Sequence, residues 1–268
     1  TSKYGSVIAS MYDVATVDGM NEKGLVANAL YLAESNYGKA GGSKPTISIS
    51  TWAQYVLDQF ATVDEAVKAL QKEPFTIIAP VLPNGSPAQG HLAITDPSGD
   101  TAIFEYVDGK LQIHHDRKYQ VMTNSPTFDK QLAINAYWEE IGGSVMLPGT
   151  NRAADRFARA SYYLKAIPEI KDSSLAVATV FSVIRGVSVP LGITTPGKPN
   201  ISSTIWRMVH APRDRVIYYD SATSPNVFRV NLSELSFDES SPVRKLTLSE
   251  GAIHGGNATD SFKESSVF

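Results

Sequence analysis

Asn124-Ser-Pro-Thr-Phe-Asp129 is the stretch on which the interpretation of this sequence depends, and Leu147-Pro-Gly-Thr-Asn-Arg-Ala-Ala-Asp-Arg156-Phe157 follows it. The apolar residues 119–122 predict a strand that runs into Asn124, whereas Arg156 follows a Pro-Gly loop at the start of a helical pattern. An amide side chain at a strand end can donate a hydrogen bond to a developing oxyanion, and a nearby guanidinium can orient carboxylates. Asn124 and Arg156 are therefore candidate catalytic residues.

Outward from this stretch, the hydrophobic pattern changes between strand and helix in blocks. Strands are expected at 6–12, 25–32, 91–95, 101–107, 111–114, 119–122, 203–210, 216–222 and 227–231. Helices are expected at 49–60, 62–70, 129–141, 153–167 and 174–187. This order is not the regular alternation of a parallel α/β fold. It predicts an α+β architecture in which two antiparallel sheets pack together with helices outside them.

Local signals support several of these elements. Thr62 with Glu65 three residues later predicts a capped helix start, whereas Asp18-Gly19 and Asn21–Gly24 predict turns. The helix at 129–141 is expected to bury an apolar stripe, namely Leu132, Ala136, Tyr137 and Ile141. With no internal repeat or linker, residues 1–268 are expected to form one domain. The Gly-, Ser- and Asn-rich residues 249–268 are expected to form a mobile tail.

Composition excludes several classes of function. The chain has 268 residues with scattered Lys and Arg and a net charge of −3, so no nucleic-acid partner is expected. No apolar run approaches the roughly 20 residues that span a bilayer, so no membrane partner is expected either. The chain contains no cysteine, which excludes disulfides and thiolate metal sites within it. His114 and His115 are adjacent on an expected strand and should point to opposite faces, so they predict no zinc site.

Six motifs resemble those of one family. They are Asp18-Gly-Met-Asn-Glu-Lys-Gly-Leu25, Thr62-Val-Asp-Glu-Ala66, Thr123-Asn-Ser-Pro-Thr-Phe128, Leu147-Pro-Gly149, Asp155-Arg-Phe157 and Ser203-Thr-Ile-Trp-Arg207. From Tyr4 to about Leu232, the chain resembles the choloylglycine hydrolase and penicillin V acylase family of N-terminal-nucleophile amidases. It is most similar to the penicillin V acylases of Gram-negative bacteria. The resemblance implies a four-layer αββα sandwich of two antiparallel sheets flanked by helices, which is the N-terminal-nucleophile hydrolase fold.

The resemblance also implies roles for three residues. In the family, an N-terminal Cys attacks an amide carbonyl and its own α-amino group serves as the base. By motif, Asn124 corresponds to the oxyanion-side amide, and Arg156 to the guanidinium that closes the polar network around the nucleophile. Tyr31 corresponds to the position that lines the acyl pocket and can contribute to the oxyanion hole. The implied substrate is a small N-acyl amide, and no metal or organic cofactor is implied. Penicillin V, bile salts and acyl-homoserine lactones are not separated by these motifs.

Each of the three residues also has a purely structural alternative. Asn124 could form an Asx turn ahead of Pro126, and Arg156 could form a surface ion pair with Asp155. Tyr31 lies between Leu30 and Leu32 in an expected strand, so it could be a packed or sheet-surface aromatic.

The absence of cysteine leaves three interpretations. The resemblance implies that the first strand pair of the family, which carries the Cys, is absent from this chain. The protein is then an amidase whose Cys lies outside residues 1–268, or a catalytically inactive relative that binds acylated ligands. A third interpretation makes Thr1 the nucleophile, although the family register places Thr1 away from the nucleophile strand. The resemblance also implies a periplasmic homo-oligomer. The short connection between Asn124 and Arg156 does not predict the tetramer of bile salt hydrolases.

Overall fold

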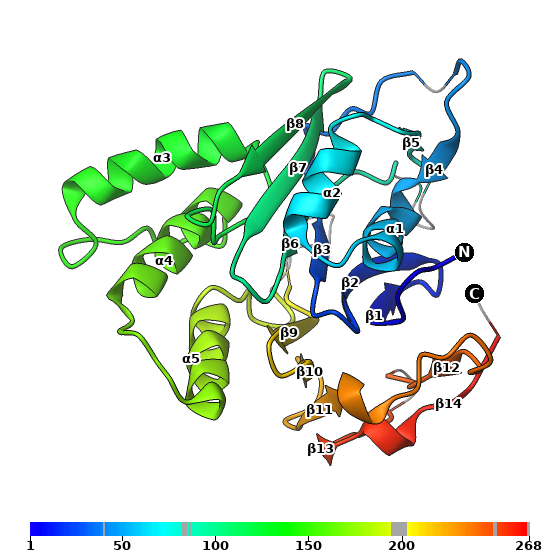
Figure 1. The fold of residues 1–268 in the computed structure, drawn as a ribbon. Helices are drawn as coiled ribbons and strands as arrows, with labels where there is room; N and C mark the ends of the chain where they lie inside the picture. Colours follow the sequence, from blue (N-terminus) through cyan, green and yellow to red (C-terminus); the bar gives the residue numbers. More distant parts are fainter. Residues whose placement is uncertain (40, 82–84, 86, 194–202, 249–250, 267–268) are drawn as a thin grey trace.

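The chain folds around two main sheets, which are antiparallel except for the parallel pairing of β13 with β11 (Figure 1). The structure is a computed structural model that describes residues 1–39, 41–81, 85, 87–193, 203–248 and 251–266. The six-stranded sheet has the order β1-β2-β3-β6-β7-β8, and the four-stranded sheet the order β13-β11-β10-β9. Two short pairs, β4 with β5 and β12 with β14, lie apart from them.

The strands in the described part of the chain have the following bounds: β1 (Ser6–Met11), β2 (Ala15–Asn21), β3 (Val26–Leu30), β4 (Thr46–Ser48), β5 (Thr76–Ile78), β6 (His91–Thr95), β7 (Thr101–Val107), β8 (Lys110–His115), β9 (Trp206–Ala211), β10 (Val216–Ser221), β11 (Val227–Asn231), β12 (Arg244–Lys245), β13 (Gly256–Asn257) and β14 (Lys263–Glu264). The helices are α1 (Trp52–Gln59), α2 (Val63–Leu70), α3 (Phe128–Ile141), α4 (Ala153–Ala166) and α5 (Ser173–Gly186), with single 3₁₀ turns at Ile49–Thr51, Leu232–Glu234 and Thr259–Ser261. None of the helices among the described residues is long and apolar enough to cross a bilayer.

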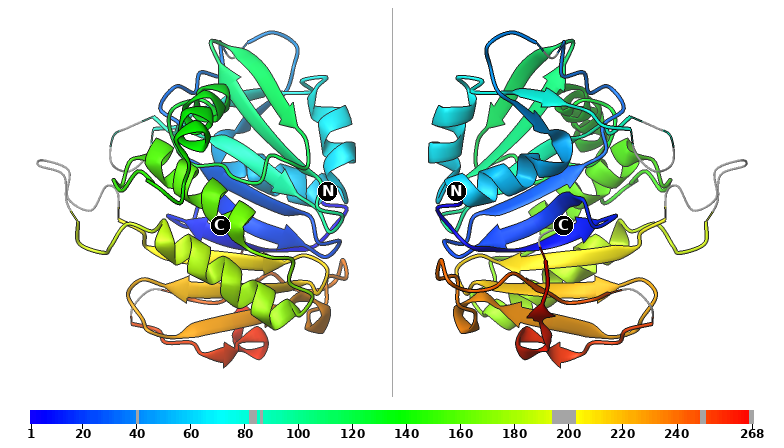
Figure 2. Two further views of the ribbon diagram at one scale, coloured as in Figure 1. Left: turned by 90° about the vertical axis from the view of Figure 1, so that its left-hand side faces the viewer. Right: turned by 90° about the vertical axis from the view of Figure 1, so that its right-hand side faces the viewer.

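Side chains alternate between the two faces of a sheet along each strand, and the residues on each face show which layer packs against it. On the outer face of the six-stranded sheet, Leu92 and Phe104 belong to the core that packs against α1 and α2. On its inner face, Met20 packs with Ile217 of the four-stranded sheet. Helix α5 lies across the far face of the four-stranded sheet, where Phe181 is buried (Figure 2). The predicted αββα sandwich is therefore confirmed.

Helices α3 and α4 cover the rest of the inner face, over β6, β7 and β8 (Figure 1). Phe128 of α3 and Phe157 of α4 pack on Ile103 of β7 in a small apolar cluster. The polar inward-facing residues of β6 and β7 therefore lie beneath the start of α3. The motif of residues 124–129 leads into this helix.

Three local expectations were wrong. Residues 119–122 form no strand in the structure. Tyr119 and Val121 instead pack against the apolar cluster that includes Phe128 of α3 and Phe157 of α4. Asp18 and Gly19 lie within β2, and the turn falls at Tyr12 and Asp13, whose φ angles are 59° and 56°. A Cβ on Gly19 would lie 2.8 Å from Ile8 Cγ2, so the glycine allows a close strand approach instead of a turn.

The third error concerns the buried face of α3. That helix buries Phe128, Gln131 and Asn135, whereas Tyr137 of the expected apolar stripe is 59% exposed. The two buried amides are hydrogen-bonded, Gln131 to the preceding segment and Asn135 to Glu139, which permits their burial.

Residues near both ends of the chain contact the rest of the fold. Lys245 Nζ lies 2.7 Å from Asp13 Oδ1, and β13 pairs with β11. These contacts support the interpretation of residues 1–268 as one domain, which stays a prediction. The mobility of residues 249–268 also stays a prediction.

The turn between β2 and β3 provides a test of stability. Asn21 is fully buried; its Nδ2 donates to the carbonyl oxygens of Leu57 and Phe60, and its Oδ1 accepts from the amides of Lys23 and Leu25. Asn21→Ala leaves these backbone groups unpaired, so we expect the free energy of unfolding to fall by roughly 2–3 kcal/mol. Urea unfolding followed by circular dichroism measures this.

The matched control is Asn36→Ala, because Asn36 is exposed and, among the described residues, its side chain accepts a single local bond, from the amide of Gly38. It should change the free energy of unfolding by less than about 1 kcal/mol. Equal effects at the two positions would contradict the role given to Asn21.

Candidate active site

The structure brings together all three residues that the sequence singles out. Asn124 Nδ2 donates to the carbonyl oxygen of Tyr31 at 2.9 Å, and Arg156 Nη2 donates to Asn124 Oδ1 at 2.7 Å. Tyr31 follows β3, Asn124 lies between β8 and α3, and Arg156 lies in the first turn of α4. Three separate elements thus meet at one side-chain amide.

Asn124 is held on both sides rather than forming the alternative Asx turn. Its Oδ1 accepts a hydrogen bond from the charged guanidinium of Arg156. This bond polarises the Asn124 amide and strengthens its remaining N–H as a donor. One Nδ2 proton is directed to Tyr31, and the described residues provide no partner for the other. A half-buried amide with a free, polarised N–H is suited to stabilising a developing oxyanion.

Arg156 takes part in the polar cluster rather than in the alternative surface ion pair. Its Nε donates to the carbonyl oxygen of Asn151 at 3.1 Å, which leaves Nη2 for Asn124. Asp155 instead accepts from the amide and hydroxyl of Thr150. Burial lowers the pKa of the Arg156 guanidinium from its ordinary value, and neighbouring Arg159 lowers it further. The guanidinium nevertheless stays protonated, because arginine starts from a very high pKa.

The Pro-Gly loop before α4 is fixed by a buried arginine. Arg159 Nη1 donates to the carbonyl oxygens of Pro148 and Thr150 at 2.7 and 3.0 Å. This holds the loop against the helix that carries Arg156, so the second quoted stretch positions the guanidinium.

Tyr31 takes part in the polar cluster through its backbone carbonyl oxygen, and its ring is exposed. The side chain is 54% exposed, and its hydroxyl lies 3.5 Å from Gln89 Oε1. Gln89 also lines a cavity of about 470 Å³ whose wall includes Ile77, Ala79 and Pro87. The acyl-pocket role of Tyr31 stays a prediction.

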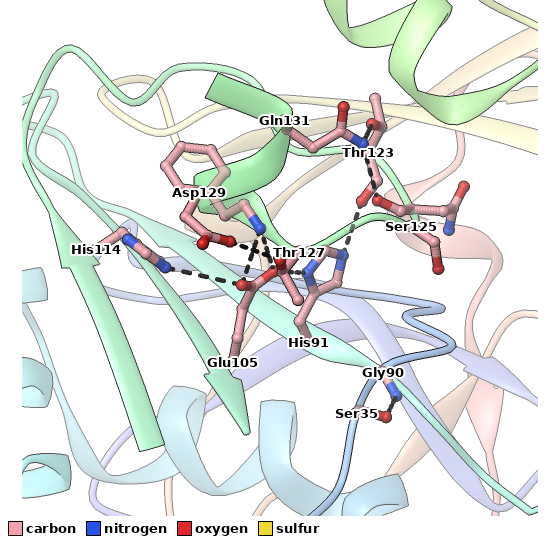
Figure 3. A network of polar contacts seen from close by, with 12 residues as sticks. Ser35, Gly90, His91, Glu105, His114, Thr123, Ser125, Thr127, Asp129 and Gln131 are labelled. Carbon is pink, nitrogen blue, oxygen red and sulfur yellow. Dashed lines mark hydrogen bonds and ion pairs between the residues drawn. The ribbon is translucent and has the colours of Figure 1, made fainter. Parts of the chain in front are cut away.

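Sequence reasoning missed a buried polar network centred on Glu105 and His91 (Figure 3). Glu105 on β7 and His91 on β6 are 0% and 2% exposed, and their side chains are 2.7 Å apart. Gln131 Nε2 donates to the carbonyl oxygen of Asn124 at 3.1 Å. The available signal was the single Glu in the apolar run of residues 101–107, because a carboxylate in a buried strand requires a partner.

The two adjacent histidines point to opposite faces, as expected. His114 Nε2 lies 3.7 Å from Glu105 Oε2 within the network, whereas His115 Nε2 lies 2.9 Å from Asp100 Oδ2 near the surface. They therefore do not converge on one point.

Comparison with known sequences identifies the family. Residues 3–245 match the family described as linear amide C–N hydrolases, choloylglycine hydrolase family. The chain is 50% identical to the penicillin V acylase of Pectobacterium atrosepticum, over 100% of this chain and 77% of that protein. It is 25% identical to the bile salt hydrolase/transferase of Clostridium perfringens, over 82% of this chain and 74% of that protein.

Solved structures of this family have a similar fold. The penicillin V acylase from Agrobacterium tumefaciens superimposes with a TM-score of 0.92 and 56% sequence identity, covering 100% of this chain and 83% of that chain. A variant of the conjugated bile acid hydrolase from Clostridium perfringens gives a TM-score of 0.76 at 23% identity over 90% of this chain and 80% of that chain, a likeness of fold alone.

These matches define the class of protein as a linear amide C–N hydrolase. The chain belongs to the choloylglycine hydrolase family, and it is an amidohydrolase similar to penicillin V acylases.

Proposed function

We propose that the protein hydrolyses the side-chain amide of penicillin V or of a related N-acyl compound and releases an apolar acyl group. The observation that carries the proposal is the Asn124 amide held between the Tyr31 carbonyl oxygen and the Arg156 guanidinium. The penicillin V acylase of Pectobacterium atrosepticum, at 50% identity over the whole chain, supports this choice of substrate.

The proposed nucleophile is a cysteine outside residues 1–268, since those residues contain none. Its thiolate attacks the amide carbonyl, and the α-amino group of the same residue takes the thiol proton and passes it to the leaving amine. The free N–H of Asn124 stabilises the oxyanion of the tetrahedral intermediate. Water then hydrolyses the thioester, which releases the acid and restores the thiol. In this proposal, residues 1–268 orient the reacting groups and stabilise the oxyanion, whereas the cysteine forms the covalent bond.

A substrate panel tests this function in the protein that carries the cysteine. Penicillin V, a glycine-conjugated bile acid and an N-acyl-homoserine lactone present different acyl groups on comparable amides. Release of the amine product should be fastest with penicillin V, and alkylation of the thiol with iodoacetamide should abolish it. Activity that survives alkylation, or no hydrolysis of any of the three, would contradict the proposal.

The alternative function is binding of acylated ligands without turnover, and the lack of cysteine in residues 1–268 is the observation that favours it. Calorimetry with phenoxyacetate and penicillin V separates the two functions. A binder retains penicillin V intact, whereas the amidase consumes it and gives a continuing heat of reaction.

Three further properties are proposed from the family resemblance. The protein is placed in the periplasm, it assembles as a homo-oligomer, and it also accepts acyl-homoserine lactones. Cell fractionation, size-exclusion chromatography with light scattering, and the lactone arm of the panel test them separately.

Arg156→Lys should lower kcat for amide hydrolysis roughly tenfold, because one ammonium cannot replace a guanidinium that donates in two directions. The two acceptors are Asn124 Oδ1 and the Asn151 carbonyl oxygen. Arg152→Lys is the matched control, since Arg152 is exposed just before α4. Steady-state kinetics on both variants should separate them, and equal kcat values would remove the role given to Arg156.

A further inference from the structure

Two of the most buried ionisable side chains in the described part of the protein bond the backbone of the segment that contains Asn124 (Figure 3). Glu105 and His91 lie on the inner face of neighbouring strands, with 0% and 2% of their surface exposed. A buried ion pair carries a large desolvation cost, and an apolar pair of similar volume often packs equally well. The presence of this pair at this place therefore calls for a role beyond packing.

Hydrogen bonds connect the pair to both ends of the segment that contains Asn124. His91 Nε2 lies 2.7 Å from the carbonyl oxygen of Thr123, and its Nδ1 lies 2.7 Å from Glu105 Oε1. The backbone amide of Phe128 donates to Glu105 Oε1 and Oε2 at 3.1 and 2.9 Å. The segment from 123 to 128 is thus held at its first and last residues.

The chemistry of the partners defines the charges. Burial by itself raises the pKa of Glu105, but His114, His91 and the Phe128 amide outweigh it and lower that pKa to about 2. Glu105 is thus a carboxylate and can only accept, as can the carbonyl oxygen of Thr123. Each ring nitrogen of His91 therefore faces an oxygen acceptor at 2.7 Å.

These bonds act on Asn124 through its own backbone. The Thr123 carbonyl belongs to the peptide plane that precedes Asn124, so the bond from His91 restricts the rotation of that plane. Gln131 Nε2 holds the following carbonyl, and Gln131 lies on the helix whose first amide is bound by Glu105. With both peptide planes fixed, the Asn124 side chain is directed between Tyr31 and Arg156.

We propose that His91 and Glu105 are positioning residues for amide hydrolysis, which hold the Thr123–Asn124 peptide plane and so direct the Asn124 amide toward the oxyanion. This inference rests on the proposed function. Neither residue touches the substrate, and both act through Asn124.

Two substitutions of His91 separate the bonds it makes. His91→Gln places an amide nitrogen near the former Nε2 and keeps the bond to Thr123, whereas the shorter side chain of His91→Asn reaches Glu105 but not Thr123. His91→Asn should lower kcat roughly tenfold with little change in KM, since one hydrogen bond that directs Asn124 is lost. His91→Gln should stay within about threefold of the native protein.

His115→Asn is the matched control, since His115 lies on the opposite face of β8 and, among the described residues, its ring bonds Asp100 alone. Its kcat should be unchanged. If His91→Gln and His91→Asn lost kcat equally, or if only KM changed, the role through Thr123 would be overturned.

A second readout does not depend on catalysis. Hydrogen–deuterium exchange followed by mass spectrometry should show faster exchange in His91→Asn over residues 122–131 and over 151–157, which contain the partners of Asn124. Exchange over residues 15–30 should be unchanged in a folded variant. Faster exchange confined to residues 89–93 would overturn the inference. If the native protein hydrolyses no amide, the proposed function fails, and the exchange data still decide whether His91 holds Asn124.

Discussion

Asn124→Ala is expected to lower kcat for amide hydrolysis by about 10²–10³, the usual cost of losing one oxyanion donor. The substitution removes the amide that accepts from Arg156 and donates to the Tyr31 carbonyl oxygen. KM should change little, because the lost bond forms in the transition state rather than in the ground state. Initial rates across a range of penicillin V concentrations measure both constants.

Asn151→Ala is the control for this prediction. Arg156 Nε donates to the backbone carbonyl of Asn151, and alanine keeps that carbonyl. The control should retain kcat within about twofold, as expected for a surface change away from such contacts. An Asn124→Ala protein with native kcat would exclude the oxyanion role.

The free energy of unfolding should fall steeply in acid because of Glu105. Its pKa is about 2 in the folded protein, against an ordinary value of 4.5. Because the folded pKa is the lower one, the stabilisation is fully present above about pH 4.5 and is lost as the pH falls toward 2. One pKa unit corresponds to about 1.4 kcal/mol, so the contribution at neutral pH is roughly 3 kcal/mol.

The measurement compares Glu105→Gln with the native protein by urea unfolding from pH 2 to 7. The variant should be less stable by roughly 3 kcal/mol at pH 7, and the difference should shrink as the pH approaches 2. Glu239→Gln, at an exposed position, should follow the native curve. A stability difference that does not change with pH would show that Glu105 acts by packing and not by charge.

Sequence patterns predicted most elements because their signals are local. Strands β6 and β7 were placed at their observed bounds, and α3, α4 and α5 within one residue at each end. The errors occurred where packing partners decide the structure. Residues 119–122 have a strand composition but pack against helices, and Gly19 serves a close strand contact that no local pattern reveals.

The candidate site was predictable only in part. Motif resemblance selected Asn124, Arg156 and Tyr31, but Tyr31 and Asn124 lie 93 residues apart, and their contact depends on how β3 and the β8–α3 segment meet. Glu105 stands out as a carboxylate in an apolar strand, but nothing local identifies His91 as its partner. Strand pairing is what places them side by side, since Leu92 lies opposite Phe104.

Mass spectrometry of the protein quenched in acid during turnover of penicillin V is the most direct test of the proposed mechanism. The proposal predicts a phenoxyacetyl adduct on a cysteine that lies outside residues 1–268, and weaker accumulation of that adduct when Asn124 is replaced. An adduct on Thr1, or turnover by residues 1–268 without any cysteine, would contradict it.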